Sequence, residues 1–239
     1  ETRHVTTMEP VPPSLEVVTK HLNSLGNKDK VIKIFQYAAQ ALMHYKYKDP
    51  TNPTTKKINT LFWSLVLHRK LFRCLNFLIE IVNIKKRLQE LQVEKNDKIN
   101  TLLLLGKNIA FLFFWPLDNF VYLCMPHTHG RLTSFDGTPP AIASYHCWTL
   151  ANLCSFARNL RLYLSEENSW ALPDRKLALV KDVADTIVSV GFSKVADPLI
   201  TWGHIGMAGI VSAVLHLHLG WPKQSIAERK QKKHPRKSE

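Results

Sequence analysis

The sequence lacks the short motifs that usually identify an enzyme. It has no Walker-type phosphate loop, because the glycine series that starts at Gly203 contains no Lys-Ser or Lys-Thr pair and follows no strand pattern. It also has no G-x-S-x-G motif and no paired-carboxylate motif, since Asp182, Asp185 and Asp197 are scattered. The residues therefore predict a protein with no catalytic site and no cofactor.

Cysteine is scarce, and no ligand pattern typical of a metal site is present. The two His-x-His pairs, at 127–129 and 216–218, have no further ligand at a recognisable spacing. The cysteines lie in apolar runs, at none of the usual zinc spacings, and are expected to be buried reduced thiols of a cytosolic or organellar protein; they are Cys74, Cys124, Cys147 and Cys154. No metal site is predicted.

Acidic residues are few relative to basic ones. The chain has 19 Asp and Glu against 32 Lys and Arg, a net charge of +13, which favours an anionic partner. A nucleic-acid binder would need a stacking or groove-reading element, and the sequence offers none. The predicted partner is therefore anionic membrane lipid. A mean hydropathy of -0.13 argues against a multi-span transporter but leaves room for one or two spans.

Apolar residues recur at spacings of three and four along most of the chain, with no strictly alternating stretch, so the predicted class is all-α. We expect a flexible N-terminus (1–13), a single helical membrane domain (14–222) and a basic cytosolic tail (223–239). Within the domain, Ser14 and Asn27 are expected to start helices, and a turn is expected at 48–55. Further helices are predicted at 56–88, 99–125, 141–164, 175–191 (ended by Gly191) and 199–220.

Residues 56–88 form the longest amphipathic pattern, which predicts one continuous helix. It carries a polar stripe and an apolar stripe side by side, an arrangement that suits the surface of an anionic membrane. The predicted insertion residues are Leu61, Leu65, Phe72, Leu75, Ile79 and Val82. The predicted headgroup contacts are Arg69, Lys70, Arg73, Lys85, Lys86 and Arg87. The alternative is a helix that packs on its neighbours and leaves a solvated basic face.

Residues 199–220 contain no Asp, Glu, Lys or Arg and are long enough to span a membrane. Trp202 and Trp221 lie where interfacial tryptophans are common. Small side chains allow membrane helices to approach closely, and the predicted packing residues are Gly206, Gly209 and Ala213. The alternative is a glycine-rich core helix. The seven Lys and Arg against two Glu after Pro222 place this end on the cytosolic side.

Residues 99–125 are more apolar but include Lys107 and Asp118. A charge inside the hydrocarbon costs roughly 3 kcal/mol on insertion scales, and Pro116 would kink the helix. We therefore predict a buried or partly inserted helix, with a second full span as the alternative. The two charges would also suit a channel for metabolites.

Four stretches, in order between about residues 14 and 222, resemble motifs of the peroxin-eleven family. "NKDKVIKIFQY" (27–37) resembles the family's GRDKxxRxxQY, and "HRKLFRCLNFL" (68–78) resembles its xRKxxRLGxxx. "FWPLDNFVYL" (114–123) resembles DxxxWL, and the region 179–214 resembles VKNxxDxxxA followed by GxxGxxSSxxG. The matching residues are Asp29, Lys30, Gln36, Tyr37, Arg69, Lys70, Arg73, Asp118, Lys181, Asp185, Gly206, Gly209 and Ser212.

The chain departs from the family pattern at several places. Asn27 replaces a glycine, and Cys74-Leu75-Asn76 replaces the usual apolar-glycine pair. Tyr122 replaces a tryptophan, and Ala213 replaces the second serine. The changes near Asn27 and Asn76 affect the expected helix geometry and leave the basic and apolar stripes in place.

The resemblance implies a peroxisomal membrane protein with both termini facing the cytosol. Family members self-associate into homo-oligomers and tubulate membrane through the amphipathic helix. They act with the dynamin-like fission machinery and the peroxisomal membrane-protein import receptor. The resemblance therefore predicts a protein that binds and remodels membrane to promote peroxisome elongation, division and proliferation. The alternative is a pore-forming protein of the same membrane that passes small metabolites.

Overall fold

The structure is a computed structural model that describes residues 8–10, 14–22, 24–93, 97–124, 137–166 and 171–225. Its long elements are helices, which confirms the predicted all-α class. The elements are β1 (Met8–Pro10), α1 (Leu15–Leu22), α2 (Leu25–Tyr45), α3 (Pro53–Phe72), α4 (Asn76–Leu91), α5 (Lys98–Cys124), α7 (Thr138–Leu164), α8 (Leu172–Ser193), α9 (Trp202–Leu219) and β2 (Lys223–Ser225).

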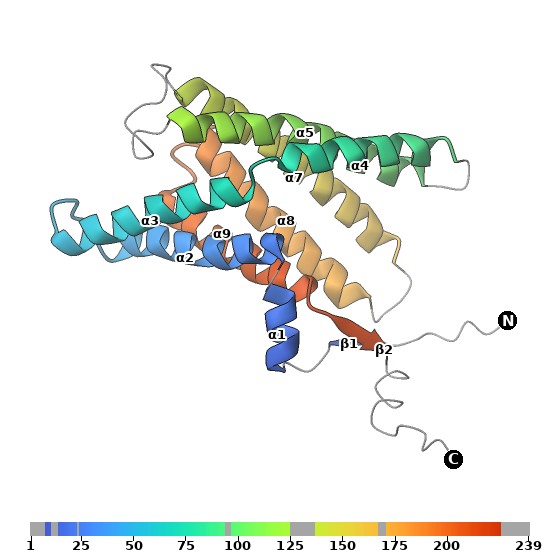
Figure 1. The fold of residues 1–239 in the computed structure, drawn as a ribbon, viewed down its shortest axis with the longest axis horizontal. Helices are drawn as coiled ribbons and strands as arrows, with labels where there is room; N and C mark the ends of the chain where they lie inside the picture. The colour runs from blue at the N-terminus through green and yellow to red at the C-terminus, as the bar shows by residue number, and fades with distance from the viewer. Residues whose placement is uncertain are drawn as a thin grey trace, which may run out of the picture.

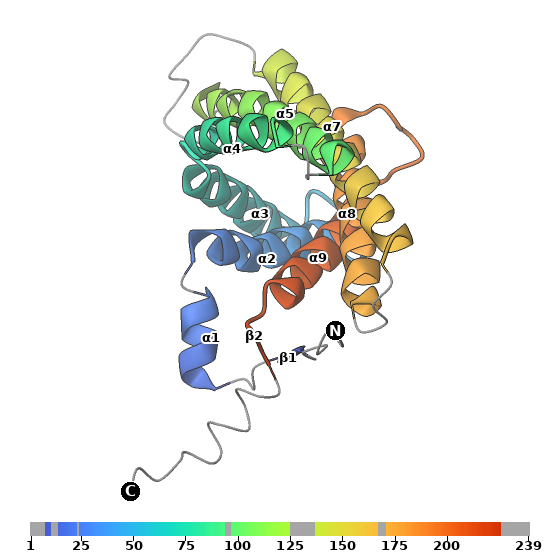
Figure 2. The same cartoon turned by 90° about the vertical axis from the view of Figure 1, so that its right-hand side faces the viewer.

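The helices from α2 to α9 form one bundle whose neighbours close a ring (Figures 1 and 2). α5 packs on α7, α7 on α8, α8 on α9, α9 on α2, and α2 on α3, while α3 touches α5. α4 lies along α5, and α1 projects away from the bundle (Figure 2). The first long helix and the last helix are therefore direct neighbours.

Side-chain caps explain where several helices begin. Val17 N donates to Ser14 Oγ (3.3 Å), as predicted for the first helix. The second helix begins at Leu25 rather than at Asn27, because Ser24 Oγ accepts from Asn27 N (3.2 Å) and caps it. Thr201 caps α9 in the same way and accepts from His204 N (3.4 Å).

The predicted helix at 56–88 is wrong as a single helix, because α3 ends at Phe72 and α4 starts at Asn76. Leu75 lies between them in the left-handed region, with φ 67°. A side chain in this region meets a steric cost of about 1–2 kcal/mol that glycine avoids. Leu75 lies in the stretch where the resembled pattern has a glycine. The break redirects the chain so that α4 follows α5 (Figure 1).

The end of α8 also differs from the prediction. The helix continues past Gly191 to Ser193, and Lys194 takes the left-handed cap position with φ 60°. Gly191 instead allows α9 to approach, since a Cβ there would lie 2.6 Å from Ile205 Cγ1. Cys74 is exposed rather than buried as predicted, while the other cysteines are partly buried.

Two helices are long and apolar enough to cross a membrane, judged by length and composition: α5 and α9. Within the most apolar window, 22% of the α5 residues and 33% of the α9 residues are buried inside the molecule. Core helices of water-soluble proteins are mostly buried, so these values favour contact with another apolar phase. The C-terminal span is predicted by the sequence, and α5 passes the same test.

Short strands join the two ends of the described chain. β1 pairs antiparallel with β2, with Glu9 opposite Gln224. These strands fall in the segments predicted as a flexible N-terminus (1–13) and a basic tail (223–239). The remaining residues of both segments lie outside the described residues, as does the His127–His129 pair.

Replacing Leu75 with glycine is expected to raise the free energy of unfolding by about 1 kcal/mol, because glycine adopts this left-handed conformation without the steric cost. Thermal unfolding of the full chain in neutral detergent measures the change. Leu88 is the matched control, since it is also exposed (50%, against 57% for Leu75) but lies inside α4. Leu88→Gly should lower the free energy of unfolding by about 1 kcal/mol. An equal loss in both variants would show that Leu75 carries no strain.

Candidate functional site: a buried ionic core and an exposed apolar stripe

The polar side of α2 faces the inside of the bundle. Asp29, Lys33 and Gln36 lie at helical spacing on one face and are 4%, 2% and 4% exposed. Tyr37, beside them, is 1% exposed and belongs to the apolar core with Val188 and Ile205. Charged residues are almost never this buried unless they are paired, so their partners decide what the site is.

Arg69 of α3 is the first partner of this face. Its Nε donates to Asp29 Oδ1 (2.9 Å), and its Nη1 donates to Gln36 Oε1 (2.6 Å). Arg73 lies at the end of α3, with its Nε 3.8 Å from Asp29 Oδ1. The same Nε donates to the carbonyl oxygen of Arg69 (3.0 Å). One carboxylate of α2 thus holds two arginines that sit one helical turn apart.

Asp118 extends the network into α5. Lys70 Nζ donates to Asp118 Oδ1 and to its carbonyl oxygen, the latter at 3.3 Å. Arg73 Nη2 lies 3.5 Å from Asp118 Oδ2, so Arg73 bridges Asp29 and Asp118. The structure therefore corrects the prediction that Arg69, Lys70 and Arg73 face lipid headgroups. Arg69 and Lys70 are 5% and 4% exposed, and all three pair with carboxylates inside the bundle.

A second set of ion pairs joins α2 to α8 and α9. Lys33 Nζ donates to Asp185 Oδ1 (2.7 Å) and to Ser212 Oγ (2.8 Å). Ser212 Oγ donates to the same Asp185 oxygen. Lys181 pairs with Asp182 (2.5 Å) and lies 3.5 Å from Asp185. We call the two sets together the ionic core; it ties α2 to α3, α5, α8 and α9.

The pKa values reflect these pairs. Burial alone would raise the pKa of Asp29, but Arg69, Arg73 and Lys30 outweigh burial and hold the pKa well below 3.8. Burial also raises the pKa of Asp185, but Lys33 and Lys181 outweigh burial and hold this pKa well below 3.8. At Lys33 burial dominates over the attraction of Asp185 and lowers the pKa to about 8. The carboxylates are therefore charged in the folded protein.

A lysine and an acid beside a serine also occur in some hydrolases. Here Ser212 is 1% exposed and Lys33 is 2% exposed, so a substrate has no path to the hydroxyl. The arrangement fixes helices rather than activating a nucleophile. Among the described residues, no group of three or more His, Cys, Asp and Glu gathers at metal-binding distance.

The small residues of α9 hold it against α2. A Cβ on Gly206 would lie 2.9 Å from Ala41 N, and one on Gly209 would lie 2.3 Å from the Tyr37 ring. Ala213 is fully buried in the same helix. The predicted packing residues therefore make a helix contact within this chain.

The apolar stripe of α3 and α4 faces outward, while the polar stripe faces inward. Glu80, Asn83 and Arg87 are partly buried along α5, and Trp115 Nε1 of α5 donates to Glu80 (3.5 Å). By contrast, Ile79 and Val82 are 58% and 67% exposed. Most of the predicted insertion residues are exposed and Leu65 is partly buried; the exposed ones are Leu61, Phe72, Leu75, Ile79 and Val82.

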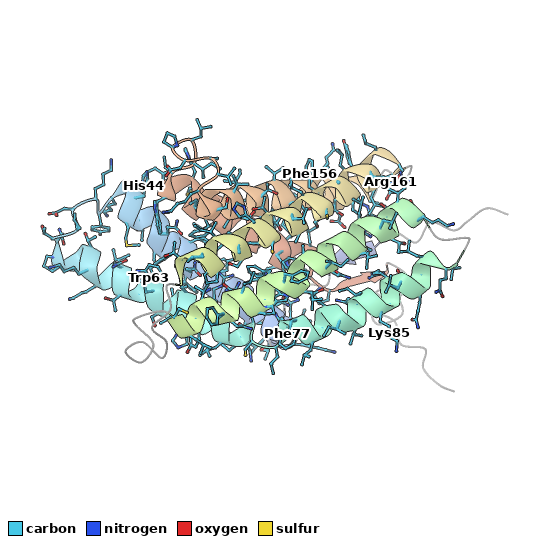
Figure 3. All side chains as sticks on the ribbon, turned by 90° about the horizontal axis from the view of Figure 1, so that it is seen from above. His44, Trp63, Phe77, Lys85, Phe156 and Arg161 are labelled. Atoms are coloured by element: carbon cyan, nitrogen blue, oxygen red, sulfur yellow. The ribbon has the colours of Figure 1, made fainter. Side chains whose placement is uncertain are left out.

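The exposed residues of α4 form what we call the α4 apolar face: Leu78, Ile79, Ile81, Val82 and Leu88. Lys85 and Lys86 are exposed beside it, and Lys85 lies at the outer edge of the bundle (Figure 3). Arg87, predicted to join them, instead pairs with Glu90 (2.6 Å). Leu61 and Leu65 lie on α3, across the break, so the structure separates them from this face.

Sequence reasoning missed the pairing of the ionic core. The available signal was the spacing of Asp29, Lys33 and Gln36 on one helical face, where Asp29 is opposite in charge to the run from Arg69 to Arg73. Asp118 was recognised as a costly charge in an apolar helix, and Lys70 supplies a partner that offsets part of that cost.

Comparisons with known proteins show which family the sequence resembles. The family described as "Peroxisomal biogenesis factor 11 (PEX11)" matches residues 15–171, which include Asp29, Arg69, Lys70, Arg73 and Asp118. The chain is also 24% identical over 248 residues to "Peroxisomal membrane protein 11-1" of Oryza sativa subsp. japonica, covering 93% of this chain and 98% of that protein. No solved structure matches significantly.

Removing one charge of a buried pair should lower the free energy of unfolding more than removing both charges. Asp118→Leu is expected to lower the free energy of unfolding by roughly 3–5 kcal/mol, because Lys70 stays buried without its carboxylate. Adding Lys70→Met should recover most of that loss. Arg161→Ala is the control, since Arg161 forms an exposed pair with Asp97 (44% and 45% exposed) and should cost less than about 1 kcal/mol. A double variant less stable than Asp118→Leu would contradict the pairing.

The depressed pKa of Asp29 predicts a loss of stability in acid. Because the folded pKa lies below the unfolded value of 3.8, the unfolded chain takes up protons first as pH falls. The stabilisation is fully present above about pH 5 and is lost progressively as pH falls through 4 toward the folded pKa. Unfolding midpoints from pH 7 to pH 3 should fall less steeply for Asp29→Asn than for the unsubstituted protein. If the midpoints of the two proteins fall equally steeply with pH, Asp29 does not contribute to the loss of stability in acid.

Proposed function

The chain belongs to the Peroxisomal biogenesis factor 11 (PEX11) family, and from this premise we propose that it is a peroxisomal membrane protein that binds and remodels its membrane. Its role is to promote peroxisome elongation, division and proliferation. The relative named "Peroxisomal membrane protein 11-1" supports the location. The family description is that of a biogenesis factor, which fits a role in shaping the organelle rather than in catalysis.

The observation that carries this proposal is the inverted arrangement of the bundle. Charged side chains of α2, α3, α5 and α8 pair inside, and large apolar side chains of α4 are exposed. Water-soluble proteins rarely expose contiguous apolar surface of this kind. In a bilayer the same surface is favourable, and charges placed inward and paired are the usual arrangement for intramembrane ions.

The α4 apolar face acts as a wedge, a surface that inserts between the lipids of one leaflet. Moving a Leu, Ile or Val side chain fully out of water contributes roughly 1.5–3 kcal/mol, so even partial insertion of this face gives substantial membrane affinity. Lys85 and Lys86 are exposed beside the face and each adds about 1 kcal/mol near anionic lipid. Insertion into one leaflet expands that leaflet relative to the other and favours curvature.

The ionic core fixes the angle at which the wedge meets the bilayer. Arg73, at the turn between α3 and α4, is held by Asp29 and Asp118, and its guanidinium lies 5.8 Å from the Trp115 ring centroid. Trp115 also donates to Glu80 of α4 (3.5 Å). The wedge is thus attached to α5, the helix proposed to anchor the domain.

Two spans explain the orientation of the termini. If α5 and α9 both cross the membrane, the segments before α5 and after α9 lie on the same side. The excess of Lys and Arg after Pro222 supports a cytosolic location for both.

The partners belong to the same proposal. Anionic lipid is the partner of the α4 apolar face and its two lysines. Self-association, the dynamin-like fission machinery and the peroxisomal membrane-protein import receptor complete the proposed set. They follow from family membership rather than from a contact described here.

The alternative of a metabolite pore receives less support from the geometry. Asp118, the acidic residue that would favour a channel, is 3% exposed and paired with Lys70 and Arg73. Its substitution would break the fold as well as any conductance. Conductance in planar bilayers by a stably folded Lys70→Met, Asp118→Leu double variant would therefore show that a pore does not depend on this charge.

The wedge is tested with the full chain reconstituted in liposomes that contain anionic lipid. Ile79→Glu with Val82→Glu should abolish tubulation seen by electron microscopy, because two carboxylates cannot enter the leaflet. Gln89→Glu with Gln92→Glu is the matched control, since it adds the same charge at exposed polar positions at the C-terminal end of α4. Tubulation that survives in the Ile79 and Val82 variant would contradict the wedge, as would equal loss in the control.

A further inference from the structure

A second group of cations lies apart from the α4 apolar face and at the edge of the ionic core. It is drawn from four helices that pack in succession, α4 on α5, α5 on α7 and α7 on α8. We call it the basic cluster, and it comprises Arg87 of α4, Lys107 of α5, Arg158 of α7, and Arg175 and Lys181 of α8. Figure 3 shows the end of the molecule concerned, marked by Lys85 of α4 and Arg161 of α7.

Three members of the basic cluster already have a carboxylate. Arg87 pairs with Glu90 (2.6 Å), Arg175 with Glu166 (3.4 Å), and Lys181 with Asp182 (2.5 Å). Asp182 also accepts from Asn159 Nδ2 (2.6 Å), and Glu80, the remaining acid nearby, accepts from Trp115 (3.5 Å). The local acids are therefore engaged.

Lys107 and Arg158 are different, since neither forms an ion pair or a hydrogen bond through its side chain within the described part of the chain. Lys107 Nζ lies 6.0 Å from the Phe111 ring centroid. Lys181 and Arg158 repel its charge, while Asp182 and Glu80, which have closer partners of their own, attract it. Arg158 Nε is shielded from solvent and has no hydrogen-bond partner, and the same holds for Arg87 Nε. Burial, with repulsion from Arg175 and Arg87, lowers the pKa of Arg158.

A guanidinium nitrogen that is shielded from water and has no partner loses the hydrogen bond that water would give it. Lys107 adds to this cost, because it sits in a helix apolar enough to cross a membrane. Such a pair of cations favours an anionic ligand. A phosphate has several acceptor oxygens, matches the fork of an arginine and also binds a lysine as a point charge.

We propose that Lys107 and Arg158, supported by Arg87 and Arg175, bind a phosphate group between α4, α5, α7 and α8. Phospholipid headgroups and free phosphate share this chemistry. Basic pockets between membrane helices are known to take lipid headgroups. The site is distinct from the surface on which the α4 apolar face acts, and it needs no membrane curvature.

The test uses the full chain in neutral detergent micelles, where no bilayer can be bent. The unfolding midpoint and the tryptophan fluorescence are followed during titration with phosphatidic acid, with phosphatidylcholine or with inorganic phosphate. Phosphatidic acid should bind at least tenfold more tightly than phosphatidylcholine. A matching response to inorganic phosphate identifies free phosphate as a ligand, and a response to phosphatidic acid alone identifies the headgroup.

The variant is Lys107→Met with Arg158→Met, and the control is Arg161→Met with Lys176→Met. The control removes two exposed cations, one at the C-terminal end of α7 and one at the N-terminal end of α8, from the end of the molecule that Arg161 marks (Figure 3). The first variant should lose at least tenfold in affinity, and the control should stay within twofold. It should also unfold at the same or a higher temperature without ligand, since it removes unpaired charges.

Equal affinity in variant and unsubstituted protein overturns the proposal, and so does an equal loss in the control. If the Lys107 and Arg158 variant fails to fold, the titrations of the unsubstituted protein alone test the proposal. A midpoint that neither phosphatidic acid nor inorganic phosphate raises above the phosphatidylcholine value then overturns the site. The site and the wedge fail separately, because the Ile79 and Val82 variant should bind phosphate normally.

Discussion

The pairing of Arg69 and Arg73 with Asp29, and of Lys70 with Asp118, is the constraint on which the rest of the structure depends. Each of these charges would be costly inside a protein without its partner. With the partners in place, α2, α3 and α5 can turn their polar faces toward one another. The outer surface is then left to apolar side chains, and the bundle becomes suited to a lipid phase.

This arrangement gives separate tasks to residues that look alike in the sequence. Arg69, Lys70 and Arg73 stabilise the bundle, whereas Lys85 and Lys86 are exposed and available to headgroups. The glycines of α9 are likewise in contact with α2 already, Gly206 with Ala41 and Gly209 with Tyr37. A second copy of the chain would therefore have to dock on another surface.

The sequence allowed the helices and their order to be predicted, because their periodicity and several caps are local properties. Periodicity shows which residues share a face, but not which face is inside. The apolar stripe through Ile79 and Val82 was therefore found, while the inward direction of the polar stripe was not. The break at Leu75 also escaped prediction, since leucine favours a helix and the amphipathic spacing continues across it. Arg73, paired with Asp29 and Asp118, lies just before the turn.

The contact between α2 and α9 has a consequence for how the protein is made. Lys33 is among the first buried residues of the chain, and its partners Asp185 and Ser212 lie on the last two helices. Until α8 and α9 have been synthesised, Lys33 has no carboxylate and Gly209 does not yet cover Tyr37. The contact between α2 and α9, and with it the ring of helices, therefore forms late in synthesis or after it.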